Sequence, residues 1–162
     1  MALGISFEDL LRYEEEQLQK WHDLFVRRPY LLKLEASPTE TVESAIFHIF
    51  TAEYHSAQRL LGEEMTPTAN LKHLTVDELF AIASEAHRKI RHFLAGASTV
   101  SLEELRTFPS TTLGEFTATP KKLLMHALVH SIRHWGQMAR ILRESGQRTD
   151  FSHDVLFSKV IQ

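Results

Sequence analysis

The chain has 162 residues, a formal charge of −3 from 18 basic and 21 acidic residues, and no cysteine. This length fits one domain over residues 1–162 with a sizeable core. The acidic balance argues against a protein that binds nucleic acid through its phosphates. The lack of cysteine excludes disulfides, thiolate catalysis and sulfur-ligated metal sites. The first residues lack the pattern of a signal peptide and no apolar stretch near the histidines spans a membrane, so we expect a cytoplasmic protein without membrane contact.

The first predicted helix covers residues 5–27 and has an acidic surface near Glu14, Glu15 and Glu16. Its buried side consists of apolar residues at helical spacing, namely Ile5, Leu10, Leu11, Leu18, Trp21, Leu24 and Phe25.

The next two helices are predicted from capping signals. In "SPTE" at 37–40, Ser37 caps the second helix, Pro38 suits the first helical position and Glu40 completes a capping box. This helix continues to about Leu61 and stops at Gly62. In "TVDE" at 75–78 the same logic starts a third helix, which continues to Gly96.

Residues 97–118 form a polar connection, in which "STVSL" and "LGEFT" predict a small hairpin. "TP" at 119–120 opens the last long helix, which ends at Ser145 before Gly146, a residue suited to the left-handed conformation. The tail is expected to pack back through its apolar residues Phe151, Val155, Leu156 and Phe157. Four long amphipathic helices in one domain predict an all-α four-helix bundle.

The last helix contains three evenly spaced histidines, His126, His130 and His134, in "HALVHSIRHWGQ". Residues four apart lie on one helix face with Cβ atoms about 5–6 Å apart. One adjacent pair can therefore chelate an ion, whereas the outer two histidines lie about 12 Å apart along the axis. The three are predicted to lie within the apolar side, where metal, buried water or a carboxylate would satisfy their polar atoms.

A third ligand would come from another helix, and His48 is the candidate. It shares a face with small residues that leave room for a cavity and with a further histidine (Ala45, Thr51, Ala52 and His55). A histidine that is merely hydrogen-bonded explains His48 equally well. The same ordinary explanation, a surface or hydrogen-bonded histidine, suffices for His22, His73, His87, His92 and His153. The Glu-x-x-His pairs of carboxylate-bridged di-iron bundles and the zincin HExxH motif are both absent.

"HALVHSIRHWGQ" resembles the signature of the DinB/YfiT-like superfamily of DNA-damage-inducible proteins, in which a helix-four segment His-x-x-x-His-x-x-x-His-x-Gly-Gln follows a helix-two histidine. "FHIFTAEYHSAQRLLG" and "GQRTDFSHDVLF" resemble the helix-two segment and the tail. The resemblance implies an up-down-down-up four-helix bundle, often a homodimer, with one divalent metal held by His48, His130 and His134.

The resemblance also assigns roles to neighbouring residues. His126 would line the pocket, and Gly136 and Gln137 would support packing against a neighbouring helix. Family members often have Asn and Arg where this chain has Val129 and Trp135. Both positions lie outside the ligand set, so the metal site is still expected, while a role of that Asn or Arg in binding substrate is in doubt.

Three imidazoles with an open position are typical of a catalytic metal site, with Zn or Ni expected first and Fe, Mn or Cu next. Relatives in the superfamily include transferases that use bacillithiol or mycothiol, so the resemblance implies a hydrolase, or a transferase that uses such a low-molecular-weight thiol, acting on a small molecule. His126 and His55 are the candidates for proton transfer. Glu53, about 140° around the helix from His48, is expected to be a solvated carboxylate.

Three other kinds of protein remain as alternatives at this point. The first is a non-catalytic metal-binding or stress-response module. The second is a nucleic-acid binder, which the charge disfavours. The third is a helical interaction domain whose histidines only form hydrogen bonds.

Overall fold

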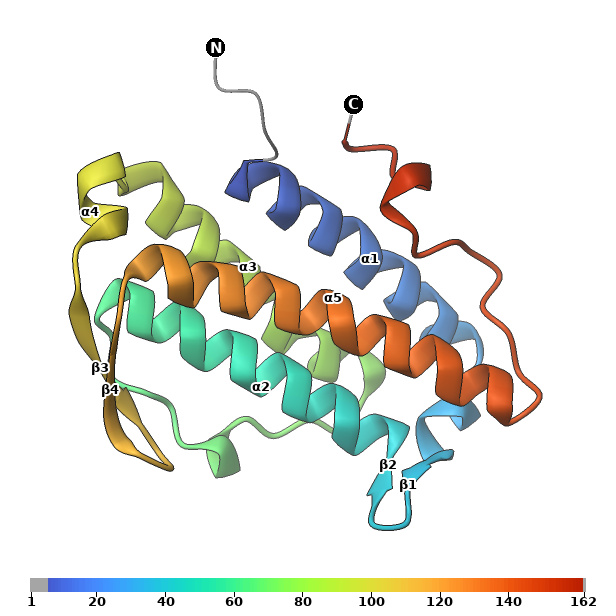
Figure 1. Ribbon diagram of the computed structural model, residues 1–162. Coiled ribbons are helices and arrows are strands. Elements are labelled where there is room, and N and C mark those ends of the chain that lie inside the picture. Colours follow the sequence, from blue (N-terminus) through green and yellow to red (C-terminus); the bar gives the residue numbers. More distant parts are fainter. Residues whose placement is uncertain (1–5, 162) are drawn as a thin grey trace.

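The computed structural model describes residues 6–161 (Figure 1). Within them the protein is mostly helical, with α1 (Phe7–Arg27), α2 (Val42–Leu61), α3 (Val76–Gly96), α4 (Thr99–Glu103) and α5 (Pro120–Glu144). Two short antiparallel hairpins accompany the helices, β1 (Glu35–Ser37) with β2 (Glu40–Thr41), and β3 (Arg106–Ser110) with β4 (Gly114–Ala118). Of the described helices, none has both the length and the apolar character needed to cross a membrane.

The four long helices pack side by side, with α3 against α1 and α2, and α5 against the same two helices. Figure 1 shows α1 and α5 running in one direction and α2 and α3 in the opposite direction. Aromatic side chains from all four helices meet in the core. The rings of Trp21 and Trp135 stack with centroids 5.1 Å apart, and those of Phe50 and Phe80 meet edge to face at 5.0 Å. The apolar periodicity of the sequence therefore marks the faces that pack together.

Side-chain caps set the starts of α1, α3 and α5. Thr75 accepts a hydrogen bond from the backbone N–H of Glu78 at 3.1 Å, and the Glu78 carboxylate accepts one from the Thr75 N–H at 3.1 Å, as predicted. Thr119 caps α5 with Pro120 in its first turn, also as predicted. Helix α1 begins at Phe7, after the capping residue Ser6, and the predicted Ile5 lies outside the described residues.

The predicted start of the second helix at residues 37–40 is wrong. Ser37 and Glu40 are paired across the turn of the β1–β2 hairpin, and α2 begins only at Val42. Proline disfavours the helical conformation of the residue before it, which places Ser37 in a strand. The cap moves to Thr41, whose side chain accepts from the Ser44 N–H at 3.2 Å.

The prediction for residues 97–118 is half right. Strand β4 matches the predicted "LGEFT" within one residue and pairs with β3, so a hairpin is present. The predicted first strand is wrong, because Ser98 caps Ser101 and the segment forms the short helix α4. Phe108 of β3 is buried and anchors the hairpin on the core formed by α2, α3 and α5.

The C-terminal tail runs back along α1. Phe151 packs edge to face on Trp21, with ring centroids 5.2 Å apart, and the Ser158 hydroxyl donates to the Glu16 carboxylate at 2.6 Å. The tail therefore packs on the helices as expected, but through Phe151 and polar contacts. The other apolar tail residues expected to be buried are exposed, namely Val155, Leu156 and Phe157.

Candidate functional site

Helix α5 brings His130 and His134 together one helical turn apart. Their Nε2 atoms are 3.1 Å apart and their ring centroids 4.3 Å apart. Two nitrogens that bind one ion at about 2.0–2.1 Å each are separated by roughly 3–3.4 Å. The pair is therefore spaced to chelate an ion, and the same separation also permits an N–H···N hydrogen bond between the two rings.

His48 faces this pair from α2. Its ring centroid lies 6.2 Å from that of His130 and 6.4 Å from that of His134. For three imidazoles around a tetrahedral ion, the centroids are roughly 5 Å apart given nitrogen–metal distances of about 2 Å. His48 would have to approach the pair by about 1 Å. Because His48 is exposed, rotation about its side-chain bonds can provide that movement.

The histidines lie at the edge of the apolar side of α5, not within it as predicted. His130 and His134 are half-buried and His126 is exposed, while Leu124, Leu128 and other apolar residues fill the core beneath them. Burial, with help from the neighbouring histidines, lowers the pKa of His130 to about 4, and burial also lowers the pKa of His134. Both rings are therefore neutral near pH 7, the form in which imidazole binds a metal.

His48 also borders a cavity of about 440 Å³ that opens to solvent between α2 and the β3–β4 hairpin. Thr51 and Ala52 line it, together with His55 and His126, as the small residues beside His48 predict. A second cavity, of about 360 Å³, adjoins His48 and His134 on their other side. The three histidines thus lie where a small molecule can reach them.

The two proton-transfer candidates both line the 440 Å³ cavity. Nε2 of His55 lies 2.8 Å from the backbone oxygen of Thr66, and since a carbonyl can only accept, Nε2 carries the proton. The other nitrogen, Nδ1, is then a proton acceptor. Burial lowers the pKa of His55, which favours this neutral form. The His126 ring lies 5.5 Å from that of His130, measured between centroids.

The neighbours of His134 differ from what the resemblance implies. Gly136 is exposed, and a Cβ atom placed on it would meet no heavy atom within 4 Å, so within the described chain it packs against no helix. Gln137 is also exposed and lines the cavity beside His134. Trp135 is buried in the core, whereas Val129 is exposed.

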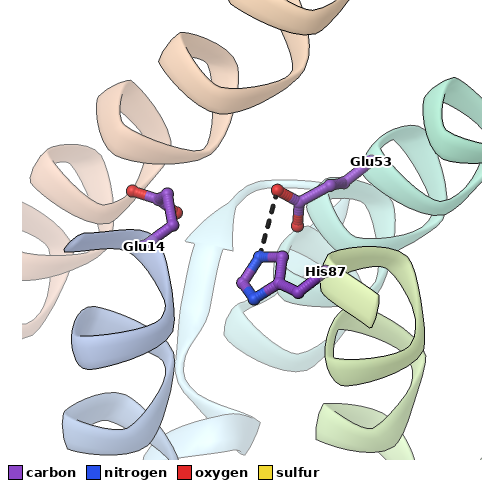
Figure 2. Close-up of side chains that lie close together, drawn as sticks. All are labelled: Glu14, Glu53 and His87. Carbon is purple, nitrogen blue, oxygen red and sulfur yellow. Dashed lines mark ion pairs between the residues drawn. The ribbon is translucent and has the colours of Figure 1, made fainter. Parts of the chain in front are cut away.

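A second polar cluster, formed by Glu14, Glu53 and His87, lies in the core (Figure 2). The expectations that Glu14 belongs to an acidic surface and that Glu53 is solvated are wrong, since they are 1% and 2% exposed. One ligand atom from each of the three residues lies within 4.8 Å of the others, so the group could hold a metal ion. Burial and then the Glu53 carboxylate raise the pKa of Glu14 well above its ordinary value. Burial lowers the pKa of His87, but Glu53 outweighs this effect and the pKa is raised.

A signal for this second cluster is present in the sequence. Glu14 lies between Leu11 and Leu18 on the apolar stripe of α1, at the spacing of three and four residues that marks a buried helix face. Glu53 and His87 occupy equivalent positions on α2 and α3. Ionisable residues at buried stripe positions of three helices should meet in the core.

The fold and the histidines define a class of largely helical proteins. In this class, histidines of two long helices face each other beside cavities that open to solvent. The chain belongs to the DinB family, because the sequence model of that family matches residues 13–159. This match confirms the resemblance of "HALVHSIRHWGQ" to the DinB signature. A comparison with curated proteins gives no match.

Proposed function

We propose that the protein is a metal-dependent enzyme with the four-helix bundle of the DinB family, and that His48, His130 and His134 bind one divalent ion. The single observation that carries the proposal is the 3.1 Å separation of the His130 and His134 Nε2 atoms, with His48 facing them from α2. The two rings on α5 are held by one turn of helix, so only His48 has to adjust.

The donor set agrees with a catalytic rather than a structural ion. Three neutral nitrogen donors leave at least one coordination position for solvent or substrate. Imidazole donors suit Zn, Ni, Fe and Cu, and we propose Zn or Ni as the ion. The exposure of His48 and the adjoining cavities keep that position accessible.

The proposed reaction is hydrolysis or thiol-dependent transfer on a small molecule. His48, His130 and His134 would hold the divalent ion, which when bound would supply a lowered pKa for water or a thiol near neutral pH. His55, with its proton fixed on Nε2 by the Thr66 carbonyl, would accept a proton at Nδ1 from a nucleophile held in the cavity that it shares with His48. Since the chain has no cysteine, the thiol has to come from a cosubstrate, as found in the reducing cytoplasm.

Elemental analysis of untagged protein tests the metal site. His48→Ala, His130→Ala and His134→Ala are each expected to hold about one equivalent of metal less per chain than the wild type. His22→Ala is the matched control, because His22 pairs with Asp77 at 2.7 Å, away from the three histidines. Equal metal content in all four variants and the wild type would overturn the assignment.

Activity assays then separate the reaction classes. Metal-loaded protein is assayed with activated esters and amides, and with electrophiles in the presence and absence of low-molecular-weight thiols. Turnover that needs the thiol identifies a transferase, and turnover with water alone identifies a hydrolase. A bound ion whose coordination positions are all filled by protein atoms, as shown by X-ray absorption, would instead favour the non-catalytic metal-binding module.

We also propose that the protein forms a homodimer. The outer face of α5 carries the apolar residues Met125 and Val129, 42% and 46% exposed, beside the histidines. A second copy covering this face would bury them. Light scattering coupled to size exclusion is expected to give twice the chain mass, and Val129→Glu is expected to return the mass to that of one chain.

A further inference from the structure

The Glu14–Glu53–His87 cluster is a separate polar centre in the core. Its residues come from three helices, Glu14 from α1, Glu53 from α2 and His87 from α3, and they are 1%, 2% and 3% exposed. Figure 2 shows the Glu53 carboxylate turned toward the His87 ring and the Glu14 side chain on the opposite side of the gap. Because His48 precedes Glu53 by five residues, the two point about 140° apart around α2, and the cluster is distinct from the three histidines.

The polar atoms of this cluster lack the partners that buried groups require. Oε1 of Glu14, Oε1 of Glu53 and both ring nitrogens of His87 are buried without a hydrogen bond among the described residues. His87 Nε2 and Glu53 Oε1 are 3.2 Å apart, which makes an ion pair but not a well-directed hydrogen bond. Buried polar groups are nearly always satisfied, so the cluster calls for a further partner.

The charges of the cluster indicate what that partner is. Within residues 6–161, no lysine or arginine nitrogen lies within 4 Å of the carboxylate of Glu14 or Glu53. A buried water could accept and donate hydrogen bonds there but would supply no positive charge, and a protonated His87 would balance only the Glu53 carboxylate with which it pairs. A divalent cation neutralises both carboxylates and binds a neutral imidazole at the same time.

We propose that Glu14, Glu53 and His87 hold a divalent transition-metal ion that joins α1, α2 and α3. Two carboxylate oxygens and one imidazole nitrogen favour an ion of the Mn, Fe or Zn class over Mg or Ca, which take oxygen ligands. The amide of Gln17 follows Glu14 by three residues on the same face of α1, and both of its polar atoms are buried without partners. Its oxygen is the candidate for a fourth ligand.

One of the three ligands, His87, borders a cleft at the surface. His87 lines a cleft of about 610 Å³ between α1 and α3, together with Glu15 and His22. The ligands themselves are almost completely buried, so substrate has no room there, and the ion acts as a structural link between three helices. Binding to the folded chain alone stabilises the fold by mass action.

The experiment uses a variant without the other proposed site, His130→Ala/His134→Ala, and titrates it with Mn(II) and Zn(II). We expect it to bind about one equivalent per chain and to show a Tm higher by about 5–10 °C when the free ion is a hundredfold above its Kd. In the Mn(II) form, electron spin echo spectroscopy should show coupling to one imidazole nitrogen. A folded variant that binds neither ion would overturn the proposal, even if the three-histidine site proves correct.

Substitutions in the same background assign the ligands. Glu14→Gln, Glu53→Gln and His87→Gln keep size and polarity, and each is expected to weaken Mn(II) binding by about a hundredfold or more. His87→Gln should also remove the imidazole coupling. Glu8→Gln, an exposed glutamate of the same helix α1, is the control and should bind as tightly as the parent. Unchanged affinity in the three ligand variants would overturn the assignment, and if any of them fails to fold, the titration of the parent still decides.

Discussion

Replacing Trp135 with alanine should show how strongly the core supports the histidine-bearing helix. Trp135 is 3% exposed, follows His134 directly in α5, and packs against α1 and α2 at once. Its ring lies 5.1 Å from that of Trp21 and 5.8 Å from that of Phe50, measured between centroids. Truncation of a buried aromatic side chain to alanine costs about 3–5 kcal/mol, a large share of the ~5–15 kcal/mol that stabilises a domain.

For a chain of this size, each kcal/mol lowers Tm by about 2–4 °C, so Trp135→Ala should melt about 6–20 °C below the wild type. Thermal and urea denaturation followed by circular dichroism measure the change. Arg143→Ala on the same helix is the control, because Arg143 is exposed and its truncation should change stability by no more than about 0.5 kcal/mol. A loss under about 1 kcal/mol for Trp135→Ala would refute the stacked packing of α5 on α1 and α2.

Three further predictions concern the tail and the helix ends. Burial raises the pKa of Glu16, but hydrogen bonds from Ser158 and Lys20 outweigh it and the net pKa is lowered from 4.5. The stabilisation of the tail by ionised Glu16 is therefore complete above about pH 4.5 and is lost as pH falls through the folded pKa. Hydrogen exchange in residues 150–161, corrected for intrinsic rates, should rise on acidification in the wild type. The rise should be less steep in Glu16→Gln. Thr75→Ala removes the cap of α3 and should lower stability by about 1 kcal/mol in urea denaturation, with Thr112→Ala, in an exposed turn, as the neutral control. Gly136→Ala should raise stability by about 0.5–1 kcal/mol, because the site is helical and open. Gly146→Ala should lower stability, because φ at Gly146 is +79°. A loss of stability in Gly136→Ala would mean that a neighbour covers this face of α5.

Helix starts follow from the sequence where one local interaction decides them. Thr75 and Glu78 satisfy each other's backbone groups within one turn, and no other structure competes for them. The segment at residues 37–40 carries the same letters of a capping box, but Pro38 favours an extended Ser37, and pairing with β2 completes the hairpin. Local capping energy of about 1 kcal/mol is small enough for such strand pairing to override it.

The burial of ionisable residues depends on how the helices pack, which local signals do not describe. The run Glu14, Glu15 and Glu16 predicts an acidic surface, yet of the three only Glu15 and Glu16 face outward to their partners Arg91 and Lys20. Since a helix turns about 100° per residue, adjacent glutamates need not share an environment. The position of Glu14 on the apolar stripe outweighs the local run of charge.

The two polar clusters illustrate two kinds of sequence signal on the same helix, α2. His48 matches a motif, and it lies at the solvent edge, where ligands and substrate can exchange. Glu53 belongs to neither the Glu-x-x-His nor the HExxH motif, and only the packing of the helices brings it to its partners on α1 and α3. Motif comparison finds sites whose ligands lie in short segments, such as the turn from His130 to His134. A site assembled from single residues on three helices is visible in the sequence only as polar residues on the apolar stripes of those helices, as Glu14, Glu53 and His87 are here.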